Sequence, residues 1–258
     1  MEVLRTEVRR LKKVKLRSPI LVEGLPGLAL VGRLAVGYLV EALGAEKFAE
    51  LYSPHFPYYV IVDSEGRIRL PRGEFYYWKN PDRGPDLMLL VGDSQAQTNE
   101  GQYEVATCVL EFARSHGVRM VITVGGYRTG EGGSKVVCAS TSKELLVKAV
   151  EAGAEISPPG SPIVGIAGLL LGLTGFMDME AICLLGETKG HLPDPKAAKN
   201  VLKVLSRLLG IEVDFADLDK SIEKAARIER SLMEVEIGDI LGREAGEGRE
   251  GRRPPYIV

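Results

Sequence analysis

The chain has 258 residues, of which 45% are hydrophobic and 26% are charged, with 33 lysines and arginines against 35 aspartates and glutamates. This composition is typical of one large globular domain with a sizeable core. It excludes a collagen-like, a fully disordered or a disulfide-framework protein. The net charge of −2 argues against a dedicated nucleic-acid-binding protein, which usually has a basic excess.

The three cysteines, Cys108, Cys138 and Cys183, lie in separate apolar runs, which predicts buried thiols in a reducing compartment. The three histidines are too scattered for a zinc site. The N-terminus lacks the apolar centre of a signal peptide, and the longest apolar stretch, 163–176, is too short to cross a bilayer. We therefore expect a cytoplasmic protein with no metal, no cofactor and no membrane or nucleic-acid partner. Its low content of glutamine and asparagine, three of each, is a bias seen in thermophiles.

Residues 1–18 are basic, with seven lysines and arginines against Glu2 and Glu7. Their apolar residues fit the period of a helix and that of a strand equally well. We favour an edge element with a solvated basic face over a phosphate-binding arm.

A strand, a Gly/Pro turn and a helix that ends at Gly44 follow from residue 19 onward. Short runs of β-branched and aromatic residues, separated by Pro, Asp and Gly, then predict a group of strands. The turn at 64–66 makes two of these strands a hairpin. Next comes a nearly continuous apolar run with an acid at each end, which is typical of a strand buried on both faces. The expected strands are 19–22, 48–52, 58–62, 67–71, 74–79 and 86–93.

Helices and strands alternate in the second half of the chain, which is typical of a parallel sheet covered on both faces. We expect an α/β fold of three layers, with a mainly parallel sheet and an antiparallel portion. The expected helices are 99–116, 142–152, 163–176 and 196–209, and the expected strands are 118–124, 136–139 and 181–185, with a loop at 125–135.

The C-terminal part of the chain differs from the rest. Residues 217–240 have an apolar stripe and predict a helix on the core or on a neighbouring subunit, whereas 243–253 are charged, Gly-rich and expected to be flexible. The predicted organisation is therefore a core over 1–212, a helical extension over 213–242 and a flexible tail over 243–258.

Three Gly-rich segments, 24–32, 125–133 and 160–168, invite comparison with phosphate-binding loops. None has the spacing of a dinucleotide-binding or P-loop motif, so close packing of backbone is the favoured interpretation for each.

Asp93, Arg128 and Glu187 each follow a predicted strand, where sheets of this class place their ligand sites. They define a possible ligand pocket. An equally simple interpretation is that the polar segment 93–98 caps the helix beginning near Asn99, with Asp93 bonded to loop amides. No catalytic residue can be assigned by spacing.

Five stretches together resemble the archaeal proteasome assembly chaperone family, which is related to the eukaryotic proteasome assembly chaperones. They occur in the expected order across residues 20–210. The stretches are VEGLPGLALVG (22–32), LLVGDSQAQ (89–97), ITVGGY (122–127), GIAGLLLGL (165–173) and CLLGETKGHLPDPKAA (183–198).

The resemblance implies a fold like that of purine nucleoside phosphorylases without catalytic residues, homo-oligomerisation, and binding to the proteasome core particle or its α-subunits. The family also uses a C-terminal hydrophobic-Tyr-any motif that docks between α-subunits. Here Tyr256 is third from the end rather than second, so the motif fits only if Val258 is surplus. The partner-binding residues that the resemblance implies are Pro255, Tyr256, Ile257 and Val258.

The function expected from the sequence is thus that of a non-enzymatic, homo-oligomeric chaperone or adaptor. It would bind the proteasome core particle through its C-terminal tail. The alternative is a small-molecule hydrolase or phosphorylase of nucleoside type, using Asp93, Arg128 and Glu187 at the strand ends.

Overall fold

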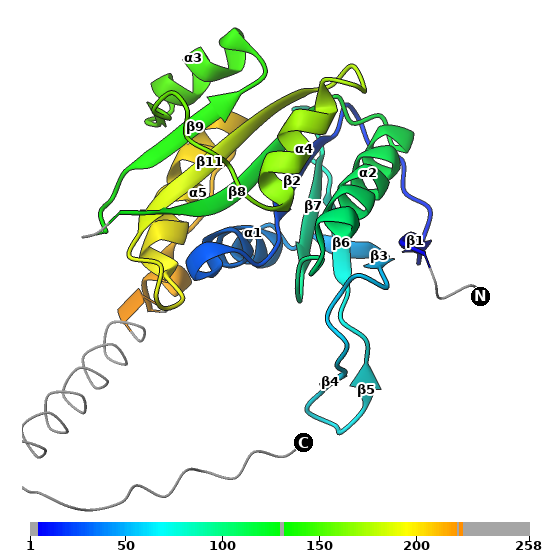
Figure 1. Ribbon diagram of the computed structural model, residues 1–258. Coiled ribbons are helices and arrows are strands. Elements are labelled where there is room, and N and C mark those ends of the chain that lie inside the picture. The colour runs from blue at the N-terminus through cyan, green and yellow to red at the C-terminus, as the bar shows by residue number, and fades with distance from the viewer. Residues whose placement is uncertain (1–4, 130–131, 221, 224–258) are drawn as a thin grey trace, which may run out of the picture.

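The computed structural model describes residues 5–129, 132–220 and 222–223, and Figure 1 shows how their elements are arranged. The helices are η1 (Leu28–Leu30), α1 (Val31–Ala42), α2 (Asn99–Ser115), α3 (Lys143–Glu151), α4 (Ile166–Thr174) and α5 (Pro195–Leu209). The strands are β1 (Glu7–Arg10), β2 (Ile20–Gly24), β3 (Glu46–Tyr52), β4 (Ile61–Val62), β5 (Ile68–Arg69), β6 (Gly73–Trp78), β7 (Leu87–Gly92), β8 (Met120–Arg128), β9 (Val136–Ser140), β10 (Glu155–Ile156) and β11 (Glu180–Thr188).

The main sheet has the strand order β1-β3-β6-β7-β2-β8-β11-β9-β10. Its centre, β7-β2-β8-β11, is parallel. On one flank β6, β3 and β1 pair antiparallel in succession, and on the other β9 pairs antiparallel to β11 and parallel to β10. The predicted sheet with parallel and antiparallel portions is therefore confirmed, and the basic N-terminal segment supplies the edge strand β1.

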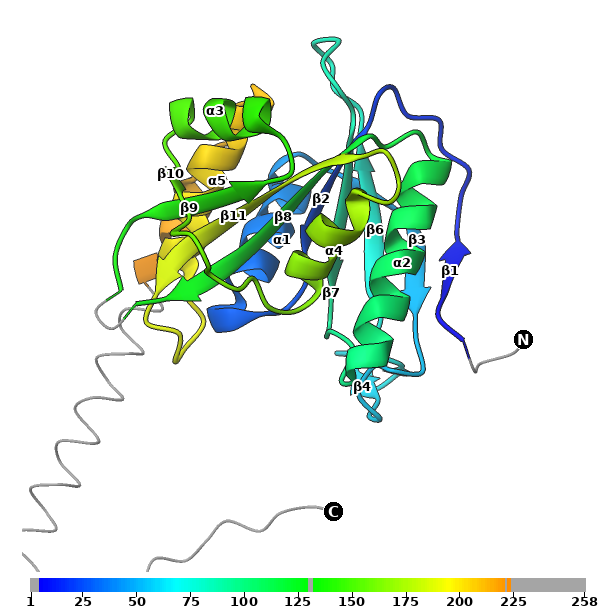
Figure 2. The same cartoon turned by 45° about the horizontal axis from the view of Figure 1, so that its top comes forward.

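Helices cover both faces of this sheet, which makes the expected three layers (Figure 2). The helices α1, α3 and α5 pack on one face and α2 and α4 on the other. Alternation along the central strands divides their apolar side chains between the two layers, because successive residues point to opposite faces. Leu21 on β2 belongs to the α2/α4 side and Val22 to the α1/α5 side, and both are fully buried.

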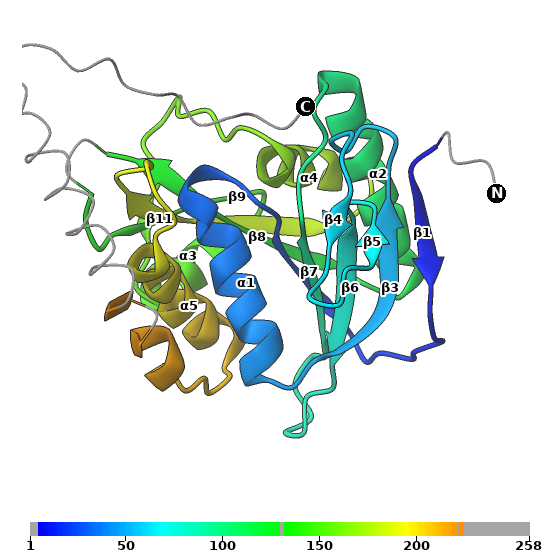
Figure 3. The same cartoon turned by 90° about the horizontal axis from the view of Figure 1, so that it is seen from below.

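The helical cover is incomplete on the α1 side. Helix α1 contacts β2, β7 and β8, and α5 contacts β9 and β11. Beside α1, no helix in the described part of the chain covers this face of strands β3 and β6. The small β4–β5 hairpin extends from the same flank (Figure 3). Polar side chains consequently occupy a face of β3 and β6 that would otherwise be core.

Glycines bring α1 close to the sheet. A Cβ on Gly32 would lie 2.2 Å from the carbonyl oxygen of Val124, and one on Gly24 would lie 2.4 Å from the carbonyl oxygen of Gly32. Both distances are far below van der Waals contact, so only glycine fits at these positions. The segment 24–32 is therefore a packing element, as its interpretation from sequence favoured.

Strands β8 and β11 are longer than predicted. The loop expected at 125–135 is wrong over 125–128, since β8 continues through Gly125 and Gly126 to Arg128 while paired with β11, which continues to Thr188. Gly186 on β11 lets α5 approach, because a Cβ there would lie 2.8 Å from Cγ2 of Val201. Glycine in a sequence favours the prediction of a loop, but here it allows close contact between the sheet and the helical layer. The short strand β10 was also not predicted.

The chain after α5 remains packed on the core at first. Leu218 is buried, and Ile222 and Phe215 pack against the α1/α5 layer. The hydroxyl of Tyr38 on α1 donates to the carbonyl oxygen of Asp214 at 2.7 Å. Residues 216–220 are helical. Residues 222–223 are helical as well, whereas the rest of the predicted extension from residue 224 and the tail over 243–258 lie outside the described residues.

Candidate functional site

Residues 58–70, called here the arm, form a hairpin whose two faces differ in character. Ile61 pairs with Arg69 and Val62 with Ile68, so even-numbered residues share one face and odd-numbered residues the other. The even face, called here the outward face, is apolar. It consists of Tyr58, Val60, Val62, Ile68 and Leu70, each at least 49% exposed.

The opposite face of the arm carries its charged residues together with Tyr59 and Ile61. The charged residues of the arm all occupy odd positions: Asp63, Glu65, Arg67 and Arg69. At the tip, Asp63 accepts hydrogen bonds from the backbone N–H groups of Glu65 and Arg67 at 3.0 and 2.9 Å, and from Nε of Arg67 at 2.9 Å. These bonds hold the pKa of Asp63 below its usual value, with the Arg67 backbone amide the largest cause. The turn is therefore closed by its own side chains.

Asp93, directly after β7, anchors the arm to the body. Both terminal nitrogens of the Arg69 guanidinium donate to its carboxylate, one of them at 3.0 Å, and the backbone N–H of Arg72 donates to it at 3.0 Å. Burial opposes ionisation, but these hydrogen bonds outweigh it and lower the pKa of Asp93. Because the odd face carries this clamp, the outward face is turned away from the anchor.

A groove of about 650 Å³ lies between the base of the arm, α1 and strands β6 and β7. Three arginines and three carboxylates line it, so their charges balance and the groove does not favour an anion over a cation. Its lining includes Gly37, Gly44 and Val91, with the ionisable side chains Arg33, Glu41, Arg69, Arg72, Glu74, Tyr76 and Asp93.

Strands β3 and β6 add an ion-pair network on their open face. Lys47 contacts Glu50 at 2.9 Å and Glu74 at 3.0 Å, and Arg72 contacts the same two carboxylates at 2.9 and 2.6 Å. Burial raises the pKa of the Tyr76 hydroxyl, and its hydrogen bond to Glu74 adds to the shift. These charges are mutually satisfied, so the network stabilises the open face and leaves little capacity for a further ligand.

Arg128 and Glu187 lie at the ends of β8 and β11, which are two and three positions away from β7 in the sheet. Glu187 is within β11 rather than after it, and its carboxylate accepts from the hydroxyl of Thr129 at 2.9 Å and the backbone N–H of Lys135 at 3.3 Å. Arg128 is the last residue of β8 and lies opposite Thr188, one position beyond Glu187. Asp93 is held elsewhere by Arg69. The described contacts therefore do not join the three residues of the possible ligand pocket.

The polar segment 93–98 is used to hold loops and a helix start. Thr98 is the N-cap of α2, and its hydroxyl accepts from the backbone N–H of Gly101 at 3.1 Å. Gln95 donates to the carbonyl oxygen of Pro26 at 2.7 Å and accepts from the backbone N–H of Ile166 at 3.1 Å. This segment therefore has the capping role that was one of its two interpretations, and Gln95 joins three loops, which the sequence did not indicate.

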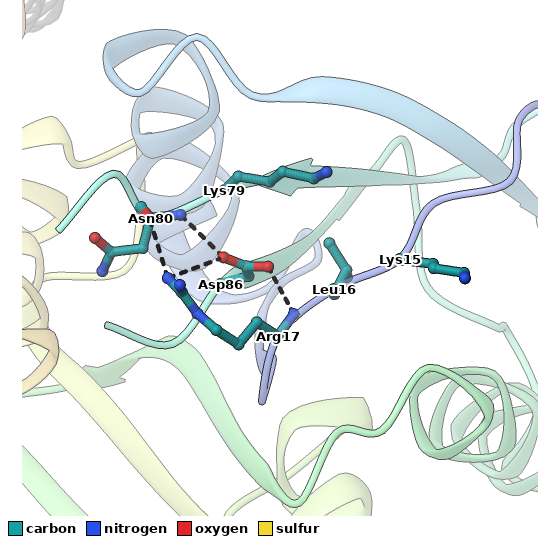
Figure 4. Close-up of a pocket in the computed structure, with 6 residues that line it drawn as sticks. All are labelled: Lys15, Leu16, Arg17, Lys79, Asn80 and Asp86. Atoms are coloured by element: carbon teal, nitrogen blue, oxygen red, sulfur yellow. Dashed lines mark hydrogen bonds and ion pairs between the residues drawn. The ribbon is translucent and has the colours of Figure 1, made fainter. Parts of the chain in front are cut away.

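A second, smaller pocket of about 350 Å³ lies where the N-terminal segment meets the turn before β7 (Figure 4). The buried carboxylate of Asp86 accepts from the backbone N–H groups of Arg17 at 2.7 Å and Asn80 at 3.0 Å. The Arg17 side chain in turn donates to the carbonyl oxygens of Asn80 and Gly84. Asp86 and Arg17 thus join the N-terminal segment to the turn before β7.

Glu23 on β2 is a buried acid that the sequence did not single out. It is 1% exposed, its Oε1 accepts from the backbone N–H of Leu25 at 2.6 Å, and its Oε2 has no partner. Burial raises its pKa to about 8, although the Leu25 bond acts in the opposite direction. The carboxyl is therefore largely protonated at neutral pH. The only sign of this buried carboxyl in the sequence is an acidic residue within an otherwise apolar strand.

The cysteines are free thiols, and both Cys138 and Cys183 are buried as predicted, whereas Cys108 is half-buried. Burial raises the pKa of Cys183 to about 12, which keeps it a thiol. Over the described part of the chain no group of three or more potential metal ligands occurs, and no helix is long and apolar enough to span a membrane. Pro255, Tyr256, Ile257 and Val258 lie outside the described residues.

A model of the PAC2 family matches residues 21–236. The uncharacterized protein MJ1210 of Methanocaldococcus jannaschii is 36% identical over 245 residues, which cover 91% of this chain and 94% of that protein. The match thus extends over nearly the whole length of both chains.

Two crystal structures from Pyrococcus furiosus share the fold. PbaB, an archaeal proteasome activator, is 38% identical with a TM-score of 0.84, over 89% of this chain and 99% of that one. PbaA, an archaeal homolog of proteasome-assembly chaperone, is 26% identical with a TM-score of 0.72, over 89% and 96% of the two chains. The sheet and its helical layers are therefore common to all three proteins.

Proposed function

Because the chain belongs to the PAC2 family, as its resemblance to archaeal proteasome assembly chaperones predicted, we propose that it is a non-enzymatic chaperone or adaptor of the proteasome. In this proposal it is cytoplasmic and homo-oligomeric, and it binds the core particle or its α-subunits. The observation that carries the proposal is the 38% identity and TM-score of 0.84 with PbaB, an archaeal proteasome activator. The resemblance also implies a fold like that of purine nucleoside phosphorylases. This likeness is part of the proposal and concerns the architecture, not the activity.

The C-terminal residues are the proposed docking element. The chain ends in Pro254-Pro-Tyr-Ile-Val258, after a charged, Gly-rich stretch. The prolines limit the conformational entropy lost on docking, Tyr256 supplies an aromatic anchor, and the terminal carboxylate can pair with a lysine of the partner. Several tails on one oligomer would raise the apparent affinity by multivalency. The organisation into core, helical extension and tail is part of this proposal.

Co-purification with the archaeal proteasome core particle tests the tail directly. Protein lacking 254–258 is expected to lose the core particle while keeping the circular dichroism spectrum of the full chain. As a matched control, Arg252→Ala and Arg253→Ala remove side chains just before the tail and are expected to retain most binding. Undiminished binding after the truncation would refute the tail mechanism.

Deleting Val258 alone examines the departure from the family pattern. Without it, Tyr256 becomes second from the end and the carboxylate moves one residue closer to it. If the surplus residue weakens docking, the shortened chain binds the core particle more tightly than the full chain. Weaker binding would mean that Val258 itself contributes to the contact.

An enzymatic function at the strand ends has less support. A hydrolase or phosphorylase site would need Asp93, Arg128 and Glu187 to converge on one substrate. Asp93 is instead bound by Arg69, and Glu187 by Thr129 and Lys135. A thermal-shift screen with nucleosides, phosphate and nucleotides tests this alternative. Stabilisation by a nucleoside that is lost in Glu187→Gln would favour it.

A further inference from the structure

Gly37, in the interior of α1, is a glycine that the packing of the fold does not explain. Gly24 and Gly32 are needed for close approach of backbone, whereas a Cβ on Gly37 would meet nothing within 4 Å, and the φ of Gly37 is not positive. A glycine inside a helix lowers stability relative to alanine. Gly37 lines the groove of about 650 Å³ beside α1, so its missing side chain keeps that part of the groove open.

Arg33 and Glu41 lie four residues before and after Gly37, on the same face of α1. All three residues line the groove. Within the described residues, neither the Arg33 nor the Glu41 side chain takes part in a hydrogen bond or an ion pair. The other arginines and carboxylates of the lining are paired with oppositely charged side chains. Over this part of the chain, the groove therefore offers a free positive charge at the start of α1 and a free negative charge near its end.

The spacing of these residues matches that of an extended peptide. Eight residues separate Arg33 from Glu41, a rise of about 12 Å along an α-helix. In an extended chain the residues i, i+2 and i+4 point to the same side, and i and i+4 are about 13 Å apart. The first, third and fifth side chains of such a peptide would thus lie beside Arg33, Gly37 and Glu41. One free amino acid is too short to reach both charges.

The rest of the lining suits a short aliphatic side chain at the middle of the peptide. Val40 on α1 and Val91 on β7 are partly buried and line the same groove, and Figure 3 shows α1 beside the strands that form its other wall. The volume of the groove lies within the range of about 300–1,000 Å³ that is usual for ligand sites.

We propose that this groove binds an extended segment of a partner protein that carries an acidic and a basic side chain four residues apart. The acidic side chain pairs with Arg33, the basic side chain pairs with Glu41, and an aliphatic residue between them lies over Gly37. The site goes beyond the proposed function, because it lies on the described body of the chain and does not involve residues 254–258. Both charges are exposed, so binding weakens as the salt concentration rises.

Isothermal titration calorimetry of the full chain at low salt tests this specificity. The probe is the peptide acetyl-Asp-Ala-Val-Ala-Lys-amide, called here the acidic–basic peptide. Its diacidic and dibasic analogues, with two aspartates or two lysines, each place one charge against a like charge. They are expected to bind about two- to fivefold more weakly, as is usual for one exposed ion pair. No binding of the acidic–basic peptide, or equal binding of all three, would overturn the proposal.

Gly37→Leu tests whether the peptide lies in the groove. The new side chain fills the space over Gly37 and is expected to weaken binding at least about tenfold. Ala42→Leu is the matched control, because Ala42 is exposed on the same helix and does not line the groove. It should bind as the unmodified chain does, and circular dichroism verifies that both variants are folded. Undiminished binding by Gly37→Leu would show that the peptide binds elsewhere.

Glu41→Arg examines the charge pairing independently of shape. With a positive charge at each end of the groove, this variant should bind the diacidic peptide more tightly than the acidic–basic one. An unchanged order of preference would mean that Glu41 does not contact the peptide.

The tail is itself a possible occupant, since residues 243–253 contain both glutamates and arginines. If the acidic–basic peptide binds only to protein lacking 243–258, the groove holds the chain's own tail and the proposal of a separate partner is wrong. Co-purification with the core particle is measured separately, so failure of the groove leaves the proposed function standing.

Discussion

Glu23 on β2 lies directly opposite Thr123 on β8 in the parallel register, and each has a buried oxygen with no hydrogen-bond partner. Glu23 lies near the carboxyl end of β2, whereas Thr123 lies in the first half of β8. Burial holds the Glu23 carboxyl in its protonated form, with a pKa raised from 4.5 to about 8. A polar pair of this kind is costly in a core, and its cost depends on pH.

Replacing Glu23 by Gln should therefore change the pH dependence of stability. Between about pH 4.5 and 8 the unfolded chain loses the Glu23 proton while the folded chain keeps it, so this group lowers stability as pH rises and its effect levels off above 8. Glu23→Gln abolishes that loss. Its free energy of unfolding relative to the unmodified chain should rise by a few kcal/mol between pH 4 and 8.5, measured by urea denaturation.

Thr123→Val provides the comparison for Glu23. It removes the unpartnered hydroxyl at nearly constant volume, so stability should change little or increase, while the pH dependence due to Glu23 persists. A stability difference for Glu23→Gln that is the same at every pH would show that Glu23 ionises freely in the folded chain.

Asp93→Asn should loosen the arm. The substitution replaces an ionised acceptor of three hydrogen bonds by an amide, and removing such charge-assisted bonds costs about 1–3 kcal/mol. The expected result is faster amide exchange and faster proteolysis at 63–67. Because the folded pKa of Asp93 is lowered, its stabilising effect is present above the unfolded pKa near 4 and is lost as pH falls below it.

Glu65→Gln is the control for that change. Its ion pair with Arg67 joins side chains that are 68% and 73% exposed, so its loss should alter exchange in the arm very little. Equal loosening by the two substitutions would mean that the Arg69 clamp does not hold the arm.

Gly32→Ala and Gly37→Ala, in the same helix, should have opposite effects. The new methyl at 32 would meet the backbone of Val124, so stability should fall by about 1–3 kcal/mol or more. At 37 nothing lies within 4 Å, and alanine in a helix interior should raise stability by about 0.5–1 kcal/mol. Thermal unfolding checks both. Tolerance of alanine at 32 would contradict the close approach of α1 to β8.

Thr98→Ala should cost about 1 kcal/mol, because it removes the side-chain cap of α2. Ser142 occupies the N-cap of α3 but makes no cap bond from its side chain, so Ser142→Ala should change stability by less than about 0.5 kcal/mol. Chemical denaturation compares them. If Ser142→Ala were the more destabilising substitution, the capping assignment would be wrong.

The sequence by itself determined the order and type of most elements, because hydrophobic period and Gly/Pro punctuation are local properties. The buried strand at 86–93, the helix from Asn99 and the hairpin at 58–70 are all present. It also determined the family, through five stretches in the right order. It misjudged 125–128, because a glycine in a strand cannot be distinguished locally from a glycine in a loop.

Only the tertiary structure decided what the polar residues do. Asp93 satisfies the rule for a ligand site at a strand end, yet Arg69, 24 residues earlier in the chain, binds its carboxylate. The same clamp directs the apolar face of the arm outward, which no local pattern encodes. Pairing between distant side chains depends on strand order and register, and these are fixed by the packing of the whole sheet.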